Sequence, residues 1–553
     1  MEPYKYTKLR PASYGEFCET FKLDIPERFN FAYDFIDATA VTDPGRLAMI
    51  HVNDDEEAAY YDFAFFSRES SRWANVLKDA GIKKGDAVMM ILYRRVEFWL
   101  AMLALHKIGA IAIPSPSMLT AKDIDYRVQS ADVKGIIAAD ESVKAVEESR
   151  KICNPGVLFH VGDGKKFDGW LPTQELVDKA STEFAKPVDF MGGEDPMVIY
   201  FSSGTSSMPK LVQHNHNYPF GHIMTAVYWH NLEEGDIHLT LADTGWAKSS
   251  WGKFYGQWLA GAIVFVYDFR GKFDADALLR MIATYKVNSF CAPPTAYRFM
   301  VLEDLKKYDL SNLHYCTTAG ELLNESVFKD WKTRTGLEIH EAYGQTETVV
   351  QIATFSFMEP KPGSIGRPCP GWDLVLLDAD GEECPTGDEG EIAVRIDTER
   401  PIGLFSGYTG DPVKTEAAMH DGYYYTGDKA WQDEDGYFWF VGRVDDLIKS
   451  SGYRIGPFEV ESVLVSHDAV IEAAVTGMPD PVRGQVVKAT VVLAKGYTPS
   501  PELTKILQDY VKNATAPYKY PRVIEYVDEL PKTISGKIRR VEIRERDNLK
   551  AQA

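Results

Sequence analysis

Short apolar runs alternate with helical patterns along the first two thirds of the chain. The run Ala87–Leu92 (AVMMIL) has no polar position, as expected of a strand buried on both faces. Glu97–Lys107 follows with a helical pattern that ends near Gly109, and Ile111–Pro114 is apolar again. This order predicts a strand–helix–strand unit, and such units place their strands in a parallel sheet.

Similar runs predict further strands of the same kind. They lie at Gly135–Ala139, Met197–Phe201, Ala262–Tyr267 and Ser289–Ala292. We therefore expect two α/β layers up to about residue 360. From about 363 to 440 the chain is rich in Gly, Pro and Asp and carries only short strand patterns, which predicts a small β-barrel-like part.

The last part of the chain has a pattern of its own. Strand patterns at Ile471–Thr476, Val486–Leu493 and Arg522–Val527 surround a helical pattern at Pro501–Lys512. A segment of roughly 110 residues is long enough to fold alone, and 553 residues exceed what one core can hold. We expect an α/β fold with a large N-terminal domain over 1–444 and a small α+β domain over 445–553.

Composition narrows the class of protein. No apolar run reaches the ~18 residues of a membrane span, and the N-terminus lacks the apolar core of a secretory signal. The six cysteines are scattered without a C-x-x-C pair, which favours reduced thiols, and we expect a cytosolic protein. The net charge of -21 argues against general nucleic-acid binding. No pattern specifies an oligomeric state.

Small hydroxyl residues crowd together after the apolar run at Met197–Phe201. The predicted phosphate-binding residues of this stretch are Ser202, Ser203, Gly204, Thr205, Ser206 and Lys210. Backbone N–H groups and hydroxyls in such a loop can point at one anion, and a lysine neutralises its charge. The spacing differs from the P-loop of NTPases. On these residues alone, a phosphate loop and a flexible surface loop are both open interpretations.

The string SSGTSSMPK resembles the signature loop of the adenylate-forming superfamily of acyl-CoA synthetases, peptide-synthetase adenylation domains and luciferases. Further motifs of that superfamily follow in its order: AGELLNE at Ala319–Glu325, YGQTET at Tyr343–Thr348, YYTGD at Tyr424–Asp428, GRVDDLIKSSGYRIGPFEVE at Gly442–Glu461 and PKTISGKIRR at Pro531–Arg540. The resemblance covers nearly the whole chain. The stretches DTGWAKSSWGKFYGQW and PDPVRGQVVKA are most similar to medium-chain acyl-CoA synthetases. One departure is Ser207, where the family commonly has glycine.

The resemblance implies a ligase that uses ATP to convert a medium-chain or aryl carboxylic acid to an acyl-adenylate. Coenzyme A then accepts the acyl group. The first step brings anions together and therefore needs cations and oriented donors. The resemblance assigns Lys537 to the carboxylate and α-phosphate, Thr346 to the α-phosphate and Glu347 to Mg²⁺. Asp428 is expected to accept the ribose hydroxyls, with Arg443 supporting it.

The same resemblance implies how the nucleotide base is held and how the two reactions share one site. Gly320, Glu321 and Leu322 are expected to line the adenine, with Tyr343 stacked on it. Asp445 is the expected hinge, about which the C-terminal domain presents either Lys537 or the coenzyme A segment. The residues expected to meet coenzyme A are Ser451, Gly452, Tyr453 and Arg454, and Lys519 and Arg540 are further candidate cations for its phosphates.

The acyl pocket is expected from Trp246, Trp251, Gly252 and Gly344. Acetate-using relatives carry a bulky tryptophan at the position of Gly344, so glycine is expected to leave room for a longer or aromatic acid. Two other functions stay open. One is an acyl-AMP ligase that loads a carrier protein, although no carrier domain follows the lysine motif. The other is a non-catalytic nucleotide- or acyl-binding homologue.

Overall fold

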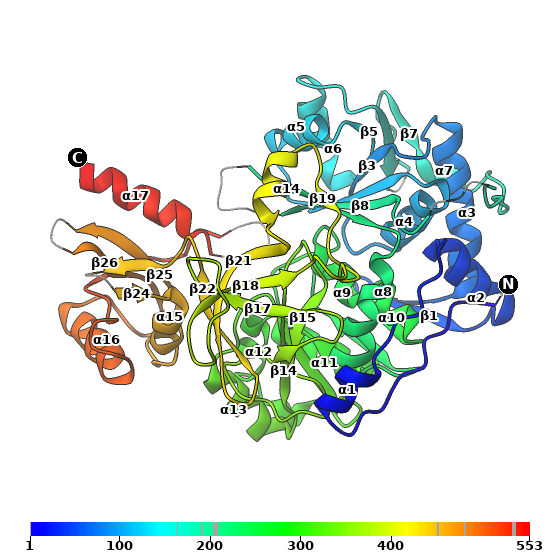
Figure 1. Cartoon of the computed structure of the whole chain (residues 1–553). Helices are drawn as coiled ribbons and strands as arrows, with labels where there is room; N and C mark the ends of the chain where they lie inside the picture. The colour runs from blue at the N-terminus through cyan, green and yellow to red at the C-terminus, as the bar shows by residue number, and fades with distance from the viewer. Residues whose placement is uncertain are drawn as a thin grey trace.

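The computed structural model consists of a large body and a smaller C-terminal part, drawn in orange and red in Figure 1. It describes residues 2–162, 164–188, 190, 192–202, 208–450, 453–480, 483–532 and 538–552. Two mainly parallel sheets form most of the large body, as the alternating pattern predicts.

One of these sheets has eight strands within the described ranges, in the order β19-β9-β8-β4-β3-β5-β6-β7. Its strands from β8 to β7 run parallel, whereas β9 and β19 are antiparallel additions at one edge. The strands are β3 (Ala87–Ile91), β4 (Ile111–Ser115), β5 (Val133–Ala139), β6 (Val157–Val161), β7 (Trp170–Pro172), β8 (Pro196–Ser202), β9 (Lys210–Asn215) and β19 (Gly407–Tyr408).

The other sheet has nine strands in the part of the chain that is described, in the order β16-β15-β14-β13-β12-β10-β11-β1-β2. Its centre is parallel and its edges are antiparallel. The strands are β1 (Leu47–Val52), β2 (Ala58–Asp62), β10 (Ile237–Thr240), β11 (Ile263–Tyr267), β12 (Ser289–Cys291), β13 (Tyr315–Ala319), β14 (Ile339–Gly344), β15 (Val350–Ala353) and β16 (Arg367–Pro368).

Helices of the large body connect and cover these strands (Figure 1). They are α1 (Tyr14–Thr20), η1 (Phe31–Asp37), α2 (Ala38–Thr42), α3 (Phe63–Asp79), α4 (Val96–Ile108), α5 (Ala121–Ser130), α6 (Asp140–Arg150), α7 (Thr173–Val177), α8 (Tyr218–Ile223), η2 (Met224–Trp229), α9 (Ala247–Gly252), α10 (Tyr255–Leu259), α11 (Ala275–Thr284), α12 (Pro294–Met300), η3 (Leu305–Lys307), α13 (Glu325–Thr335) and α14 (Pro412–Ala418).

The predicted strand–helix–strand unit is confirmed as β3, α4 and β4. Helix α4 is buried along nearly its whole length, which explains why its sequence is apolar on every side. Gly109 ends the helix with a φ of 81°, a left-handed conformation that glycine adopts without steric cost. Strands β3 and β4 then pair in parallel.

The β-rich part after residue 363 is an antiparallel sheet beside the two large sheets. It contains β17 (Leu374–Leu377), β18 (Gly390–Arg395), β20 (Met419–His420), β21 (Tyr423–Gln432) and β22 (Phe438–Arg443). The last of these, β22, ends at Arg443, and the next strand belongs to another sheet. The sheets therefore change close to the domain boundary predicted after residue 444.

The C-terminal part is a small α+β unit, in agreement with the sequence. Its elements are β23 (Ile448–Ser450), β24 (Tyr453–Ile455), α15 (Pro457–Val465), β25 (Val470–Asp480), β26 (Gly484–Leu493), α16 (Pro501–Ala514), β27 (Val523–Tyr526) and α17 (Arg540–Gln552). Its core joins the sheet to the apolar face of α16 through Leu503, Leu507 and Val511.

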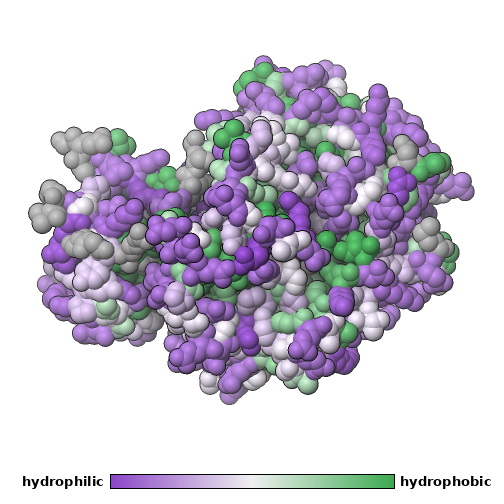
Figure 2. All heavy atoms as spheres, in the orientation of Figure 1, coloured by the Kyte–Doolittle hydropathy of each residue, from purple (hydrophilic) through white to green (hydrophobic). Residues whose placement is uncertain are grey.

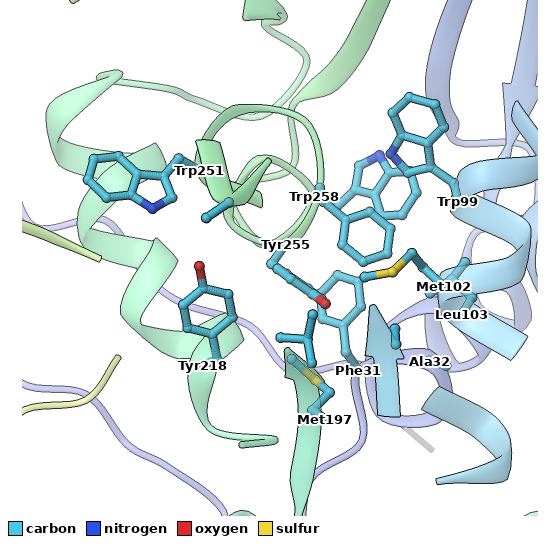
Figure 3. Close-up of a cluster of buried hydrophobic side chains, with 14 of the residues drawn as sticks. Phe31, Ala32, Trp99, Met102, Leu103, Met197, Tyr218, Trp251, Tyr255 and Trp258 are labelled. Carbon is cyan, nitrogen blue, oxygen red and sulfur yellow. The ribbon is translucent and has the colours of Figure 1, made fainter. Parts of the chain in front are cut away.

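A cluster of aromatic side chains forms the core where α4, α10 and η1 meet (Figure 3). Phe31 stacks on Trp258 with their ring centroids 6.4 Å apart. The indole N–H of Trp99 donates to the carbonyl of Lys253, and that of Trp258 donates to the carbonyl of Ala48, each at 2.8 Å. The first bond anchors the segment that follows α9, and the second anchors α10 to β1.

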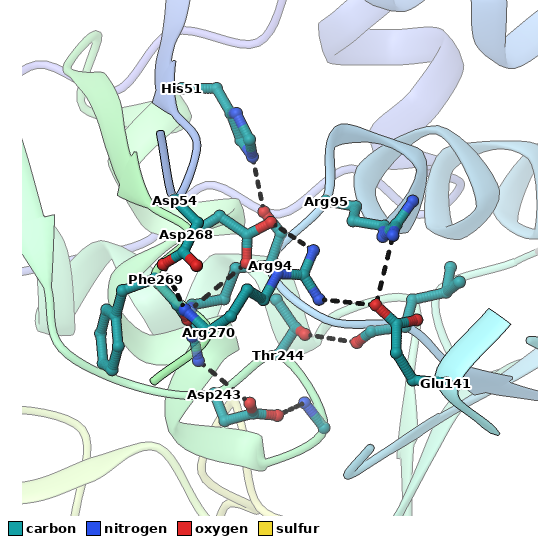
Figure 4. A network of polar contacts seen from close by, with 12 residues as sticks. His51, Asp54, Arg94, Arg95, Glu141, Asp243, Thr244, Asp268, Phe269 and Arg270 are labelled. Atoms are coloured by element: carbon teal, nitrogen blue, oxygen red, sulfur yellow. Dashed lines mark hydrogen bonds and ion pairs between the residues drawn. The ribbon is translucent and has the colours of Figure 1, made fainter. Parts of the chain in front are cut away.

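A polar network joins the carboxyl ends of strands from the two large sheets (Figure 4). Arg94, after β3, lies 3.2 Å from the Asp243 carboxylate and 3.8 Å from that of Asp268. The ring of His51 on β1 contacts the carbonyl of Arg94 at 2.7 Å. The network ties β3 of one sheet to the ends of β1, β10 and β11 in the other. Ligand sites of α/β proteins lie at such carboxyl ends.

The surface and the cysteines agree with the composition. The face in Figure 2 is mainly hydrophilic, with small separate hydrophobic areas. Among the described residues, no helix combines the length and the apolarity needed to cross a membrane. All six cysteines are free thiols.

Candidate active site

A cavity of about 1000 Å³ lies between the large body and the C-terminal part. Its walls come from the ends of β13, β14 and β21 and from α15, β25 and the start of α17. All the predicted nucleotide and metal residues that the structure describes line it together: Ser202, Lys210, Gly320, Glu321, Leu322, Tyr343, Gly344, Thr346, Glu347, Asp428 and Arg443. Motifs more than 200 residues apart in sequence thus meet at one cavity.

Asp428 is held in place from several sides. It lies on β21 directly opposite Arg443 on β22, with 3.4 Å between guanidinium and carboxylate. The hydroxyl of Tyr343 and the side-chain amide of Gln345 each donate to the same carboxylate oxygen at 2.6 Å. Burial raises the pKa of Tyr343 well above its ordinary value, so the phenol remains a donor. Such a fixed carboxylate can accept hydrogen bonds from a cis-diol.

Gln345 was not predicted as a site residue, although it lies within the YGQTET motif. Its amide also donates to the carbonyl of Thr426 at 2.8 Å, and its oxygen accepts from the hydroxyl of Tyr424 at 2.6 Å. Each polar atom of the amide therefore has a partner. Gln345 links β14 to β21 and orients Asp428.

Tyr408 connects the predicted metal ligand to the phosphate-loop lysine. Its hydroxyl donates to Glu347 at 3.0 Å and accepts from the ammonium of Lys210 at 3.3 Å. Glu347 is 8% exposed, so one face of its carboxylate reaches the cavity. Tyr408 lies outside all the motifs identified in the sequence. It is brought to the site because β19 pairs with β9, which begins at Lys210.

The turn that carries Thr346 and Glu347 is anchored to β9. The ring Nε2 of His214 donates to the carbonyl of Thr346 at 2.8 Å. Burial lowers the pKa of His214 to about 4, so the ring is neutral at physiological pH. The backbone N–H of Gln345 donates to the hydroxyl of Thr348 at 2.9 Å. These bonds hold the turn without using the side chains of Thr346 and Glu347.

The segment predicted to line the adenine follows β13. Gly320 has a φ of 96°, which favours glycine at this turn. The N–H of Leu323, just after the segment, donates to the buried carboxyl of Glu341 at 2.9 Å. Burial raises the pKa of Glu341 to about 8. Glu341 was not predicted from the sequence, because an isolated glutamate on a strand carries no motif signal.

The predicted acyl-pocket residues are arranged differently from the expectation. Trp246, Trp251 and Gly252 are not among the described residues that line the cavity, whereas Gly344 is. A Cβ added to Gly344 would lie 2.5 Å from Cη2 of Trp251 and 2.4 Å from the carbonyl oxygen of Val349. The indole of Trp251 therefore fills the space beside Gly344 that we expected to be open. The acyl role of these residues stays a prediction.

Several predicted residues lie outside the described residues: Ser203, Gly204, Thr205, Ser206, Ser207, Ser451, Gly452, Lys537 and the side chain of Arg454. Ser202 and Lys210, which flank the phosphate loop, face each other across β8 and β9. Lys532 and Ile538, which flank the lysine loop, pair with each other and line the cavity.

Of the remaining predicted coenzyme A residues, Arg540 is among the described residues that line the cavity, and Tyr453 and Lys519 are not. Tyr453 is 51% exposed, stacks on Tyr518 with ring centroids 4.1 Å apart, and is absent from the described lining of the cavity. Lys519 binds Glu459 at 2.5 Å. Arg540 lines the cavity but binds Glu461 through two bonds of 3.0 and 2.6 Å. Both candidate cations are thus paired in this arrangement.

The predicted hinge residue, Asp445, lies in the segment between β22 of one sheet and β23 of the next. The carboxylate of Asp445 is 3.6 Å from Nε of Arg443, and its side chain is 40% exposed. This contact places the expected pivot next to the residue that supports Asp428.

The family models that match this chain describe AMP-binding enzymes, which agrees with the residues that line the cavity. The family model of AMP-binding enzymes matches residues 36–409, and the model of the AMP-binding enzyme C-terminal domain matches 459–537. The mitochondrial acyl-coenzyme A synthetase ACSM4 of Mus musculus is 43% identical over 95% of this chain and 91% of its own length. The mitochondrial synthetase ACSM3 of the same species is 41% identical over 97% and 93%.

A solved structure of similar fold is the anthranilate CoA ligase AuaEII in complex with anthranoyl-AMP. It has a TM-score of 0.87 and 29% identity, over 96% of this chain and 99% of that one. The expected α/β fold with its smaller C-terminal part is confirmed by this likeness.

The comparisons correct one expectation and establish the family. The prediction of a cytosolic protein is wrong, because the curated relatives are named as mitochondrial. Unpaired cysteines indicate only that no disulfide framework is needed, and they do not identify the compartment within the cell. By the match of the family model and by these relatives, the chain belongs to the AMP-binding enzyme family and falls among its acyl-coenzyme A synthetases.

Proposed function

We propose that the chain is an AMP-forming acyl-CoA synthetase. It activates a carboxylic acid with ATP and transfers the acyl group to the thiol of coenzyme A. The observation that carries the proposal is the set of polar contacts around one cavity. A buried carboxylate, Asp428, is oriented for a diol on one side, and Lys210 and Glu347 are joined through Tyr408 on another.

In the first half-reaction a carboxylate oxygen of the acid attacks the α-phosphorus of ATP. The bond to the bridging oxygen breaks and pyrophosphate leaves with the electron pair. Asp428 accepts the ribose hydroxyls, and Tyr343 and Gln345 keep its carboxylate in position. Lys210 stands at the base of the phosphate loop, and Lys537 supplies the charge between carboxylate and phosphate. Fixed charges of this kind lower the barrier because they need no reorganisation during the reaction.

Magnesium is proposed as the metal of this half-reaction. Among the residues described, no group of three or more His, Cys, Asp or Glu side chains could form a closed metal site. Glu347 offers one carboxylate at the cavity, which suits an ion that takes most of its ligands from phosphates and water. Bound there, Mg²⁺ would neutralise charge on the phosphate oxygens.

In the second half-reaction the thiolate of coenzyme A attacks the acyl carbonyl and AMP leaves. We propose that the C-terminal domain turns about Asp445 between the two steps. The position of the lysine-loop flanks supports this order: Lys532 and Ile538 line the cavity, whereas Tyr453 of the coenzyme A segment does not. The present orientation thus suits adenylate formation, and a rotation would exchange the two segments.

The acid is proposed to be medium-chain or aryl. Support comes from the similarity to acyl-coenzyme A synthetases and to a ligase solved with anthranoyl-AMP. The position of Trp251 beside Gly344 bounds the space on that side. A panel of straight, branched and aryl acids identifies the substrate when pyrophosphate release is measured for each.

The central test uses Lys537→Ala and the surface control Lys505→Ala. Pyrophosphate release is measured with ATP and acid, and thioester formation is measured separately from supplied acyl-AMP and coenzyme A. Lys537→Ala should lose the first activity far more than the second, and Lys505→Ala should keep both. A wild-type enzyme that releases no pyrophosphate with any acid of the panel would refute the proposed function.

A further inference from the structure

We propose that Arg298 and Asn324 of the large domain latch the C-terminal domain in the orientation for adenylate formation and so position the lysine loop, residues 533–537. The inference rests on the domain alternation of the proposed function and adds its positioning residues. Neither residue was singled out in the sequence. Both lie at the rim where the two domains meet, on α12 and at the start of α13.

Arg298 makes the first contact across the boundary. Its Nη1 donates to the carbonyl of Ile471, at the start of β25, over 2.6 Å. Glu321 of the large domain and Glu472 of the C-terminal domain interact electrostatically with its guanidinium. A charged donor on a backbone carbonyl is strong, because the guanidinium keeps its charge and its donors are rigid. The contact fixes the position of β25.

Asn324 makes the second contact across the boundary, through the amide nitrogen of its side chain. Its oxygen accepts from the N–H of Ser326 at 2.8 Å and caps α13. Its Nδ2 donates to the carbonyl of Ser462 on α15 at 3.0 Å and lies 3.3 Å from the hydroxyl of the same serine. Asn324 is 8% exposed, so these bonds form away from bulk water. One residue thus joins the N-terminus of α13 to α15.

The two elements that the latch contacts are the two that hold the ends of the lysine loop. Lys532, just before the loop, binds Glu472 on β25 at 2.7 Å. Arg540, just after it, binds Glu461 on α15 at 3.0 and 2.6 Å. Glu461 also accepts from the N–H of Val475 at 2.7 Å, which ties α15 to β25.

The helix that follows the loop, α17, is also tied to the residue after the hinge. Arg544, one turn beyond Arg540 on α17, binds the carboxylate of Asp446. The residues that flank the loop, β25, α15 and the hinge region therefore form one connected unit. Holding that unit at Ile471 and Ser462 holds the two flanks of the loop, Lys532 and Ile538, at the cavity. Rotation about Asp445 requires both contacts to break.

The latch has a consequence for the two half-reactions. Losing a contact that exists only in the adenylate-forming orientation lowers the population of that orientation. Adenylate formation then slows, while thioester formation from supplied acyl-AMP is spared. A residue that merely stabilised the fold would lower both activities by the same factor.

The test compares Arg298→Ala and Asn324→Asp with matched controls. Aspartate retains the capping oxygen of Asn324 but cannot donate to Ser462. Arg334→Ala is the arginine control, since Arg334 also donates to a carbonyl, that of Glu303, but within the large domain. Ser462→Ala removes only the longer 3.3 Å contact. Arg298→Lys restores a cationic donor and should recover part of the activity.

Each half-reaction is measured separately, by pyrophosphate release at saturating ATP and acid and by thioester formation from acyl-AMP. We expect Arg298→Ala and Asn324→Asp to slow the first about tenfold, equivalent to ~1.4 kcal/mol, and to leave the second within about twofold. Arg334→Ala and Ser462→Ala should change neither. Equal losses in both assays would overturn the latch. So would a raised KM for ATP with an unchanged maximal rate, which would assign Arg298 to ATP binding. A wild-type enzyme inactive in both assays would instead refute the proposed function.

Discussion

Replacing Trp251 by alanine is expected to extend the cavity behind Gly344 and to shift the preferred acid toward longer chains. The indole is 6% exposed and its Cη2 would lie 2.5 Å from a Cβ on Gly344, so it fills the space behind Gly344, which itself lines the cavity. The reverse change that the sequence suggests, a tryptophan at position 344, would place its Cβ 2.4 Å from the carbonyl of Val349. Trp251 is therefore the residue to change.

The size of the effect follows from the burial of apolar surface. Each methylene that enters the new space gains ~0.8 kcal/mol. Such a gain corresponds to about fourfold in kcat/KM for every added methylene. Over three methylenes the variant should prefer the longer acid by roughly 60-fold relative to the wild type. The gain should stop where the new space ends.

Stability sets the choice of variants. Truncating a buried tryptophan to alanine costs about 3–5 kcal/mol, so Trp251→Phe serves as a milder second change. Trp73→Ala is the matched control, because Trp73 is buried on α3 and is not one of the nearest side chains to Gly344. It should lower the melting temperature by a similar amount without changing the chain-length profile.

The assay is pyrophosphate release with straight-chain acids of increasing length, expressed as kcat/KM for each enzyme. The profile of Trp251→Ala should extend to longer acids, and that of Trp251→Phe should lie between it and the wild type. If the folded Trp251 variants kept the wild-type profile, the acyl chain would not lie on the Trp251 side of Gly344. The pocket assignment of Trp246, Trp251 and Gly252 would then be refuted.

Three further changes test other parts of the site. Tyr343→Phe removes a hydrogen bond to Asp428 and should raise the KM for ATP about tenfold, with the KM for the acid as control. Asp445→Pro should trap one domain orientation and spare one half-reaction; unchanged rates in both would refute the hinge. Burial raises the pKa of Glu341 to about 8 from an ordinary 4.5, so the folded state keeps a proton that the unfolded state releases. Stability should therefore fall as pH rises from 4.5 to 8, by up to ~1.4 kcal/mol per unit, and Glu341→Gln should flatten the melting temperature over that range.

The sequence predicted the elements whose pattern is local. The run at Ala87–Leu92 and the helix ending at Gly109 appear in the structure within two residues of the expected bounds. The apolar runs sufficed because strands buried on both faces carry no polar alternation. The predicted nucleotide residues that the structure describes all line the cavity, since each motif keeps its chemistry in consecutive positions.

What the sequence did not predict depends on pairing between distant segments. Tyr408 reaches Glu347 only because the two-residue strand β19 pairs with β9, and nothing local marks so short a strand. Arg298 and Asn324 contact the C-terminal domain only in a given orientation of the two domains. Such contacts are set by tertiary structure, so composition and spacing carry no trace of them.

The acyl pocket shows why a missing side chain is weak evidence for an open space. Gly344 suggested room because a larger residue closes the pocket in acetate-using relatives. Protein interiors are close-packed, so a side chain absent at one position is commonly replaced by a neighbour from another element. Here that neighbour is Trp251 on α9, which Gly252 brings close to β10 because a Cβ there would collide with Thr240 at 1.9 Å. Substrate length in this chain should therefore depend on the packing of α9 against β10, and the Trp251 variants measure that dependence directly.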